Sequence, residues 1–178
     1  MPDNWQPPGL TPIHYLNETV ILGNRPLLIH CNYLTDEEIS TIKYSGASVA
    51  FCPRSHHFFG HTNHPFQKLL DAGINVGLGT DSLASNDTLS ILDEMKFLSL
   101  RHSISPKTLL TMATINGAKA LGLESNTGQI KEGFQADLCG VRLPDIPVGN
   151  IYSQLLDTAS KNIFTMIAGT ICYQAKSG

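Results

Sequence analysis

Three short segments with hydrophobic residues at every second position predict β-strands, at residues 26–31, 48–52 and 74–79. The segments between them have helical features. The clearest is a capping box, in which Thr35 is the N-cap and Glu38 occupies the third helical position. Strands that alternate with helices at short spacing predict parallel strands joined by right-handed crossovers. The first part of the chain is therefore expected to be α/β.

The third predicted strand has two unequal faces. Ile74, Val76 and Leu78 fall on one face, while the other is nearly free of side chains until Asp81. This pattern is typical of a parallel strand that packs helices on its apolar face and looks into a barrel interior or a crevice on the other. Asp81 then lies at the carboxyl end of the strand, where active sites of such folds gather.

Other helices are predicted from serine, aspartate and proline at their starts and glycine at their ends. They are expected at residues 11–16, 65–73, 88–100 after Asp87 as the cap, and 106–121 after Ser105 as the cap. The segment 54–64 is predicted to be a loop, and Glu94 and Lys96 are interpreted as helix surface.

The pattern changes after residue 126. Residues 128–133, 137–142 and 163–173 have the features of short strands, with a turn near Gly169, and a short helix is predicted at 150–156. The last part of the chain is therefore expected to form a separate small β unit.

Composition excludes several classes of protein. The 178 residues are 42% hydrophobic and 15% charged, which suffices for one core and a small appendage. A net charge of -3 indicates neither a nucleic acid nor an anionic membrane as partner, and no apolar run approaches the roughly 20 residues that span a bilayer. Four scattered cysteines are interpreted as small buried residues in a reducing compartment, so we expect a cytoplasmic protein without a signal peptide.

Three consecutive strand ends bear polar residues with possible chemical roles. His30 ends the first strand, residues 52–64 follow the second with four of the seven histidines, and Asp81 ends the third. Parallel neighbours bring these ends together, so a histidine and a carboxylate there could bind a divalent metal or move protons. The alternatives are a structural histidine and an aspartate that caps a helix or makes an Asx turn.

The order of several motifs resembles the amidohydrolase superfamily. The similarity is strongest to the cytosine-deaminase-like metal-dependent hydrolases, in the branch that deaminates adenosine-type thioethers and related amino-purines. The motifs lie at residues 30–34 (HCNYL), 52–55 (CPRS), 77–82 (GLGTDS), 114–122 (TINGAKALG) and 128–138 (GQIKEGFQADL).

The resemblance implies a (β/α)8 barrel with a small β-sandwich. It assigns residues 1–126 to the C-terminal portion of the barrel, strands six to eight, and residues 127–178 to the C-terminal part of the β-sandwich domain. His30 would polarise the metal's water and the developing oxyanion, and Asp81 would bind the metal and accept a proton. The implied cofactor is a divalent metal, with zinc preferred and iron as the alternative.

The sequence departs from the family pattern in its metal ligands. The family also uses a His-x-His pair at strand one and a histidine at strand five, and neither is present here. The chain is therefore expected to be a C-terminal portion that self-associates or lacks an N-terminal half. Leu28, Ala50 and Cys52 would then meet water.

The resemblance implies a small-molecule substrate. Arg54, Ser55, His56 and Ser82 are candidate substrate-binding residues, and His61 or His64 could supply a further ligand; the alternative is a solvated polar loop with capping residues. The Phe58–Phe59 pair could line a ring-binding pocket or be buried under the loop. The expected reaction is hydrolytic deamination of an amino-substituted purine- or pyrimidine-like ring. The alternatives are a chlorohydrolase, a cyclic-amide hydrolase, and a non-catalytic metal-free fragment or subunit completed by another chain.

Overall fold

A parallel three-stranded sheet is the centre of the fold in the computed structural model, which describes residues 6–146 and 149–176. Its strands are β1 (Leu27–Ile29), β2 (Ser48–Phe51) and β3 (Asn75–Leu78), hydrogen-bonded in the order β1-β2-β3. All three strands were predicted from the sequence, and the structure confirms them.

The apolar face of this sheet is covered by helices. Leu28, Val49 and Val76 stand in register across the three strands and belong to the main hydrophobic core. The capping box at Thr35 is confirmed: the Glu38 amide donates to Thr35 Oγ1 at 3.2 Å, and the Thr35 amide donates to Glu38 Oε2 at 2.8 Å. The elements that contribute buried side chains to this core from the first half of the chain are α1 (Pro12–Glu18), the short 3-10 helix η1 (Leu22–Asn24), α2 (Asp36–Ser45) and α4 (Phe66–Asp71).

The opposite face meets α7 (Ile115–Ala120). The Asn75 side chain donates to the carbonyl of Asn116 at 3.0 Å, and the Asn116 side chain donates to the carbonyl of Val76 at 2.9 Å. The two backbones pack closely here, since a Cβ atom at Gly77 would already be in van der Waals contact, 3.5 Å from the Cα atom of Gly117.

The covering of both faces corrects one expectation. Leu28 and Cys52 were expected to meet water, but they are only 9% and 3% exposed. Ala50 is half-buried.

The helix predicted at residues 106–121 is divided in two. The structure has α6 (Pro106–Ala113), capped by Ser105 as predicted, and then α7, with Thr114 between them at φ −125° and ψ −91°. The Thr114 hydroxyl donates to the carbonyl of Leu110 at 2.7 Å, a local bond that competes with a continuous helix. The break turns α7 onto β3, a packing preference that the helical sequence pattern does not contain.

Two further local predictions were wrong. Residues 54–64 are not entirely a loop, because α3 (Pro53–Phe58) begins at Pro53, a favourable first helical residue. The helix α5 (Ile91–Arg101) starts later than predicted, with Ser90 as its cap, and Asp87 instead forms an ion pair with Arg54.

The last part of the chain forms an antiparallel sheet of β4 (Leu138–Arg142), β5 (Lys161–Ile167) and β6 (Thr170–Gln174). The helix α8 (Ile151–Leu155) precedes β5 and is capped by Asn150. The strand predicted at 128–133 is absent: Gly128 and Gly133 have φ values of 91° and 81°, which extended strands do not adopt.

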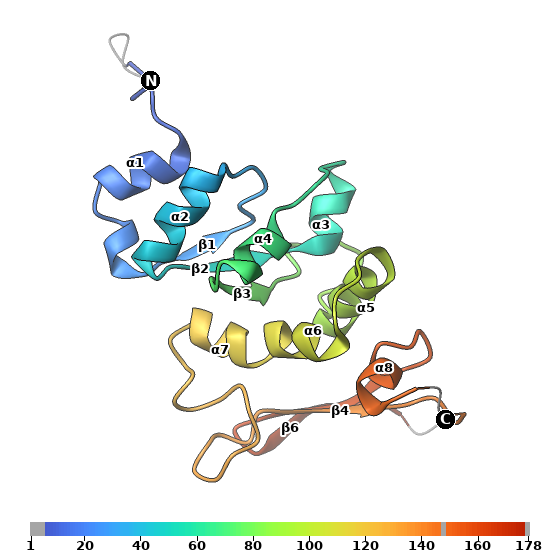
Figure 1. Ribbon diagram of the computed structural model, residues 1–178. Coiled ribbons are helices and arrows are strands. Elements are labelled where there is room, and N and C mark those ends of the chain that lie inside the picture. Colours follow the sequence, from blue (N-terminus) through green and yellow to red (C-terminus); the bar gives the residue numbers. More distant parts are fainter. Residues whose placement is uncertain (1–5, 147–148, 177–178) are drawn as a thin grey trace.

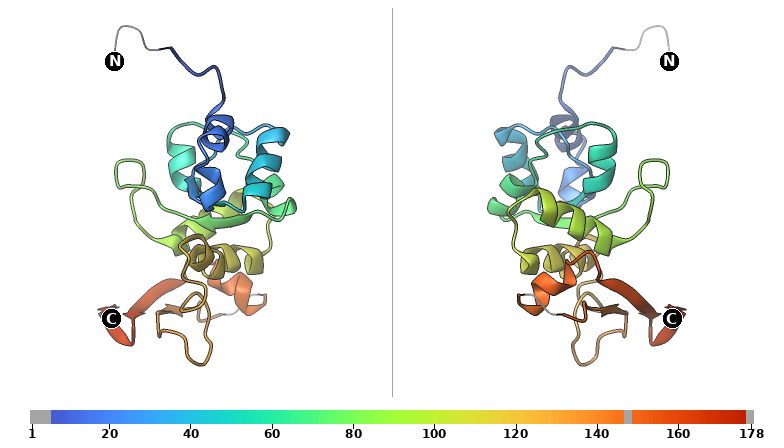
Figure 2. Two further views of the ribbon diagram at one scale, coloured as in Figure 1. Left: turned by 90° about the vertical axis from the view of Figure 1, so that its left-hand side faces the viewer. Right: turned by 90° about the vertical axis from the view of Figure 1, so that its right-hand side faces the viewer.

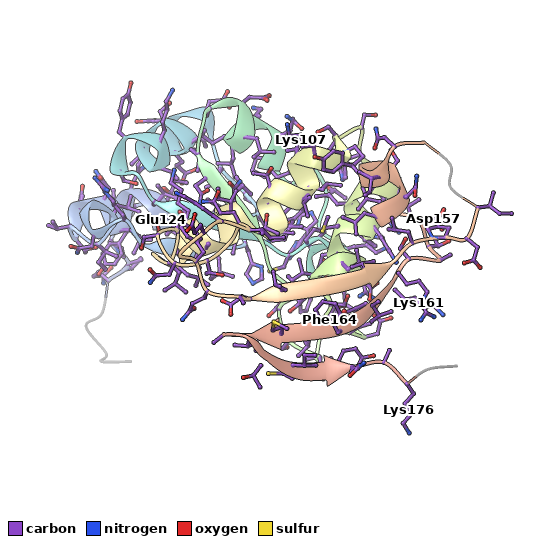
Figure 3. The ribbon with its side chains drawn as sticks, turned by 90° about the horizontal axis from the view of Figure 1, so that it is seen from below. Lys107, Glu124, Asp157, Lys161, Phe164 and Lys176 are labelled. Atoms are coloured by element: carbon purple, nitrogen blue, oxygen red, sulfur yellow. The ribbon has the colours of Figure 1, made fainter. Side chains whose placement is uncertain are left out.

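The helices α6 and α7 lie between the parallel sheet and the antiparallel sheet (Figures 1 and 2). The first described residues and the last lie at opposite ends of the molecule. No side chain of β4, β5 or β6 is fully buried, so the main core belongs to the parallel sheet and its helices. Figure 3 shows the antiparallel sheet from below, with Phe164 on β5 beside β4.

The cysteines only partly follow the sequence interpretation. Cys52 is buried and Cys31 half-buried, but Cys139 and Cys172 are exposed, and all four are free thiols. Among the described residues, no helix combines the length and the apolar character that a membrane crossing requires. The cytoplasmic location stays a prediction.

Candidate functional site

His30 and Asp81 converge at the carboxyl ends of the parallel strands. His30 follows β1 directly, Asp81 follows β3, and the His30 Nε2 and Asp81 Oδ2 atoms are 3.9 Å apart. Both residues have left-handed backbone conformations, with φ values of 68° and 58°. Such values are uncommon outside glycine and require support from the surroundings. The side chains are 38% and 31% exposed, so solvent and a ligand can reach both.

Two serines hold the Asp81 carboxylate. Ser55 Oγ donates to Asp81 Oδ2 at 2.6 Å, and Ser85 Oγ donates to the same oxygen at 3.0 Å. The hydrogen bond from Ser55 is the main cause that lowers the pKa of Asp81 below its ordinary value, with support from Ser85, the Ser82 amide and the nearby His30. Asp81 is therefore held as an anion near neutral pH.

His64 supports the backbone of His30. Its ring stacks on Phe51 at a centroid distance of 3.8 Å and an angle of 18°, and its Nε2 atom donates to the carbonyl of His30 at 2.6 Å. Burial lowers the pKa of His64 to about 4, so the ring is neutral at pH 7. Nδ1 is buried and has no hydrogen-bond partner among the described residues. Nε2 is thus engaged by the His30 carbonyl, and a role of His64 as a further ligand stays a prediction.

A pocket of about 260 Å³ opens above this end of the sheet. His56 and His61 lie on its wall, and each is held through Nδ1, at 2.9 Å from Asn32 Oδ1 and at 2.6 Å from the Tyr33 hydroxyl. Burial, with the neighbouring histidines, lowers the pKa of His56. The pocket is lined by His30, Asn32, Ser55, His56, Phe59 and His61.

Phe59 lines this pocket, whereas Arg54 and Ser82, the two remaining predicted substrate-binding residues, lie outside its lining. Arg54 forms an ion pair with Asp87, and its side chain is only 17% exposed. Ser82 is exposed, and its hydroxyl accepts a hydrogen bond from the Ala84 amide at 3.2 Å. Phe58 and Phe59 are largely exposed and stack edge to face, so they are not buried under the loop. The substrate-binding roles of Arg54, Ser55, His56 and Ser82 stay predictions.

Sequence reasoning missed the residues that support the site. Glu94 was interpreted as helix surface, but it has no exposed area and burial raises its pKa. Its position could have been found, because Ile91, Glu94 and Leu98 follow the apolar stripe of α5. Ser85 and Asn86 are both buried, but they lie in a loop without any periodic pattern from which burial could be predicted; the position of Asn86 after Asp81 suggested only substrate contact or helix capping.

The site was also compared with the requirements of a metal ion. Among the described residues, no three His, Cys, Asp or Glu side chains are placed to hold a metal together. A catalytic zinc site usually has three protein ligands. His30 and Asp81 supply donors of the right chemical type, and the serine bonds to Asp81 both fall on Oδ2, so Oδ1 is the oxygen that can face an ion. These residues fit part of a metal site.

A second cavity, of about 1180 Å³, lies beside α1, α2 and α4. Its lining includes Glu38, His64 and His102 but neither His30 nor Asp81. Although this cavity is larger, the smaller pocket is lined by His30 and Ser55, which both lie beside the Asp81 carboxylate, and we therefore take the smaller pocket as the candidate site.

Comparison with known proteins gives a consistent result. The model of the amidohydrolase family matches residues 10–172. A 5-methylthioadenosine/S-adenosylhomocysteine deaminase of Pyrococcus furiosus is 41% identical over 143 residues, which are 76% of this chain and 34% of that relative.

Solved structures agree with this match. An adenosine deaminase from Xanthomonas campestris with bound zinc superposes with a TM-score of 0.86 and 30% identity, over 92% of this chain and 40% of that one. An atrazine chlorohydrolase from Arthrobacter aurescens complexed with zinc gives a TM-score of 0.84 and 26% identity, over 94% and 40%. The chain thus spans well under half the length of each of these proteins.

Proposed function

The chain belongs to the amidohydrolase family, and on this premise we propose that it forms the C-terminal part of the active site of a metal-dependent hydrolase. In this proposal β1, β2 and β3 are strands six, seven and eight of a (β/α)8 barrel. Residues 1–126 belong to the barrel and residues 127–178 to a small β-sandwich domain. The proposed reaction is hydrolytic deamination of an amino-substituted purine- or pyrimidine-like ring, which is supported by the deaminases among the relatives.

One observation supports this function most directly. His30 and Asp81 follow β1 and β3, which are not neighbours, and still bring Nε2 and Oδ2 to 3.9 Å. A hydrogen-bond donor and an anion at this spacing suit the attack of water on a ring carbon and the transfer of a proton.

A divalent metal, which we propose to be zinc, would supply a water of lowered pKa and Lewis acidity. Asp81 would contribute one ligand oxygen, and further ligands would come from outside the described residues. The roles of the chain's own residues follow from the contacts. Ser55 and Ser85 keep Asp81 ionised, which lets it accept a proton. His30 presents its ring to the pocket, and His64 fixes the carbonyl of His30.

The assay for this function uses the complete product of the gene that encodes this chain. Ammonia release is measured with zinc over a panel of amino-purines, amino-pyrimidines and their nucleosides. Turnover that falls by at least about 100-fold in Asp81→Asn, the low end for losing a general base, supports the proposal. Turnover that Asp81→Asn leaves unchanged contradicts it.

A chlorohydrolase is the second candidate, supported by the structural likeness to the atrazine enzyme. Chloride release from chlorinated triazines, measured in the same preparations, separates the two reactions. Release of neither ammonia nor chloride would favour a non-catalytic chain, or a subunit completed by another polypeptide.

A further inference from the structure

Glu94 is a fully buried carboxylate in the middle of α5. Its two oxygens accept two hydrogen bonds: Oε2 from the backbone amide of Arg54 at 3.0 Å, and Oε1 from the side-chain amide of Asn86 at 2.6 Å. A buried carboxylate is costly unless it is hydrogen-bonded in this way. The side chain therefore connects α5 to the start of α3 and to the loop that follows Asp81.

Each of the two donors is the sequence neighbour of a serine that holds Asp81. Ser55 follows Arg54, and its hydroxyl lies 2.6 Å from Asp81 Oδ2. Ser85 precedes Asn86, and its hydroxyl lies 3.0 Å from the same oxygen. Each oxygen of Glu94 thus holds a residue that is next to one of the two serines. Glu94 is in this way connected indirectly to both hydrogen bonds that the Asp81 side chain accepts.

A third connection reaches the backbone of Asp81. The Asn86 side chain that donates to Glu94 also donates to the carbonyl of Thr80 at 2.8 Å. Thr80 directly precedes Asp81, whose φ of 58° is a conformation that persists only when neighbouring contacts support it.

We propose that Glu94 is a positioning residue that sets the direction of the Asp81 carboxylate through Ser55, Ser85 and Asn86. The inference rests on the proposed function in one respect: the role of Asp81 in the reaction comes from that proposal. Glu94 itself lies behind these residues and does not line the pocket. The alternative is that Glu94 only joins α3 to α5 and affects stability without affecting Asp81.

The first experiment reads the Asp81 side chain directly and needs neither metal nor substrate. The variant Glu94→Gln has nearly the same shape, but its amide group points hydrogen atoms at one of the two donors. The carboxyl 13C chemical shift of Asp81 is measured by NMR at fixed pH in the whole chain, with hydrogen exchange at the Arg54 and Ser85 amides. We expect the Asp81 signal to move by at least half of the change seen in a Ser55→Ala/Ser85→Ala double variant.

A combined variant makes the test specific. In the double variant only the connection through Asn86 and Thr80 remains, so adding Glu94→Gln should move the Asp81 signal by much less than the same substitution does in the original chain. A full additional shift would overturn the proposal, as would an Asp81 signal that stays at its original position in Glu94→Gln. Glu37→Gln on α2, where the side chain is 81% exposed, is the matched control and should leave the signal unchanged.

A second variant covers the case in which Glu94→Gln does not fold. Asn86→Ala removes only the loop connection, so the Asp81 signal should move while the exchange of the Arg54 amide stays slow. An unchanged Asp81 signal in a folded Asn86→Ala protein would contradict the proposal. In a protein with turnover, Glu94→Gln should lower kcat by about 10- to 100-fold with little change in KM, the effect of a misplaced reacting group. Because the NMR result is independent of turnover, a failure of the proposed function leaves this inference testable.

Discussion

His30 Nε2 lies 3.9 Å from Asp81 Oδ2 across the end of β2, although their strands are separated by that middle strand. Adjacent strands are about 4.8 Å apart, so β1 and β3 are roughly twice that distance from each other. Left-handed backbone conformations at both residues accompany this inward approach of the two side chains. The pair is therefore a consequence of local backbone geometry as much as of strand order.

The first prediction concerns the support of Asp81 by Ser55. Ser55→Ala should lower the free energy of unfolding by about 1 kcal/mol, because it removes a hydrogen bond to a charged group while Ser85 remains bonded. Urea unfolding at pH 7 measures the effect. Ser82→Ala is the control, since its hydroxyl lies in an exposed turn, and it should change stability by less than about 0.5 kcal/mol. Equal effects of the two variants would argue against the assigned bond.

The second prediction concerns pH and His64. Burial, together with His56, His30 and His102, lowers the pKa of His64 to about 4 from its ordinary value of 6.5. The unfolded chain therefore binds a proton first as the pH falls. The stability from His64 is complete above pH 6.5 and is lost progressively down to about pH 4, by about 3 kcal/mol.

Unfolding measured at several pH values checks this dependence. In His64→Gln the decrease in the free energy of unfolding between pH 6.5 and pH 4 should become much smaller. The variant should also be less stable than the original chain at pH 7. His57→Gln, at an exposed position, should keep the pH dependence of the free energy of unfolding that the original chain has. If the free energy of unfolding of His64→Gln falls as steeply with pH as that of the original chain, other groups cause the pH dependence. His56 is then the first candidate, because its pKa is also lowered.

The third prediction concerns the antiparallel sheet. Gly140 pairs with Phe164, and a Cβ atom at position 140 would meet the Phe164 ring at 2.1 Å. Gly140→Ala should destabilise the chain by about 1 to 3 kcal/mol through overpacking. Gly23→Ala meets only an ordinary contact at 3.9 Å and serves as the control. Hydrogen exchange of the β4 and β5 amides should accelerate in Gly140→Ala alone; unchanged exchange there would contradict the register.

The fourth prediction concerns association. The outer edges of β1 and β3 have no partner strand among the described residues, and Ile167, Ile171 and Tyr173 are each at least half exposed on the antiparallel sheet. Open strand edges are templates for other chains. We expect the chain to self-associate in light-scattering measurements. A sharp monomer of 19.4 kDa with protected strands would show that the edges are adequately covered.

The sequence by itself determined the three parallel strands, the Thr35 capping box and the placement of His30 and Asp81 at strand ends. These features depend on side-chain alternation and on local hydrogen bonds between residues a few positions apart, which a linear pattern contains. The division of the helix at Thr114 and the absence of a strand at 128–133 were not predicted. They depend on packing against β3 and on backbone conformations that periodicity does not specify.

Only the tertiary structure decided how the site is supported. Glu94, Arg54 and Asn86 come from three separate segments and meet because α3, α5 and the loop after β3 pack together. His64 likewise became a half-buried, neutral support of His30 through its stacking on Phe51, and not a solvated loop residue. The sequence could identify the residue types, but burial and hydrogen-bond partners arise from contacts between distant positions, and these determine both the pKa shifts and the positions of the reacting groups.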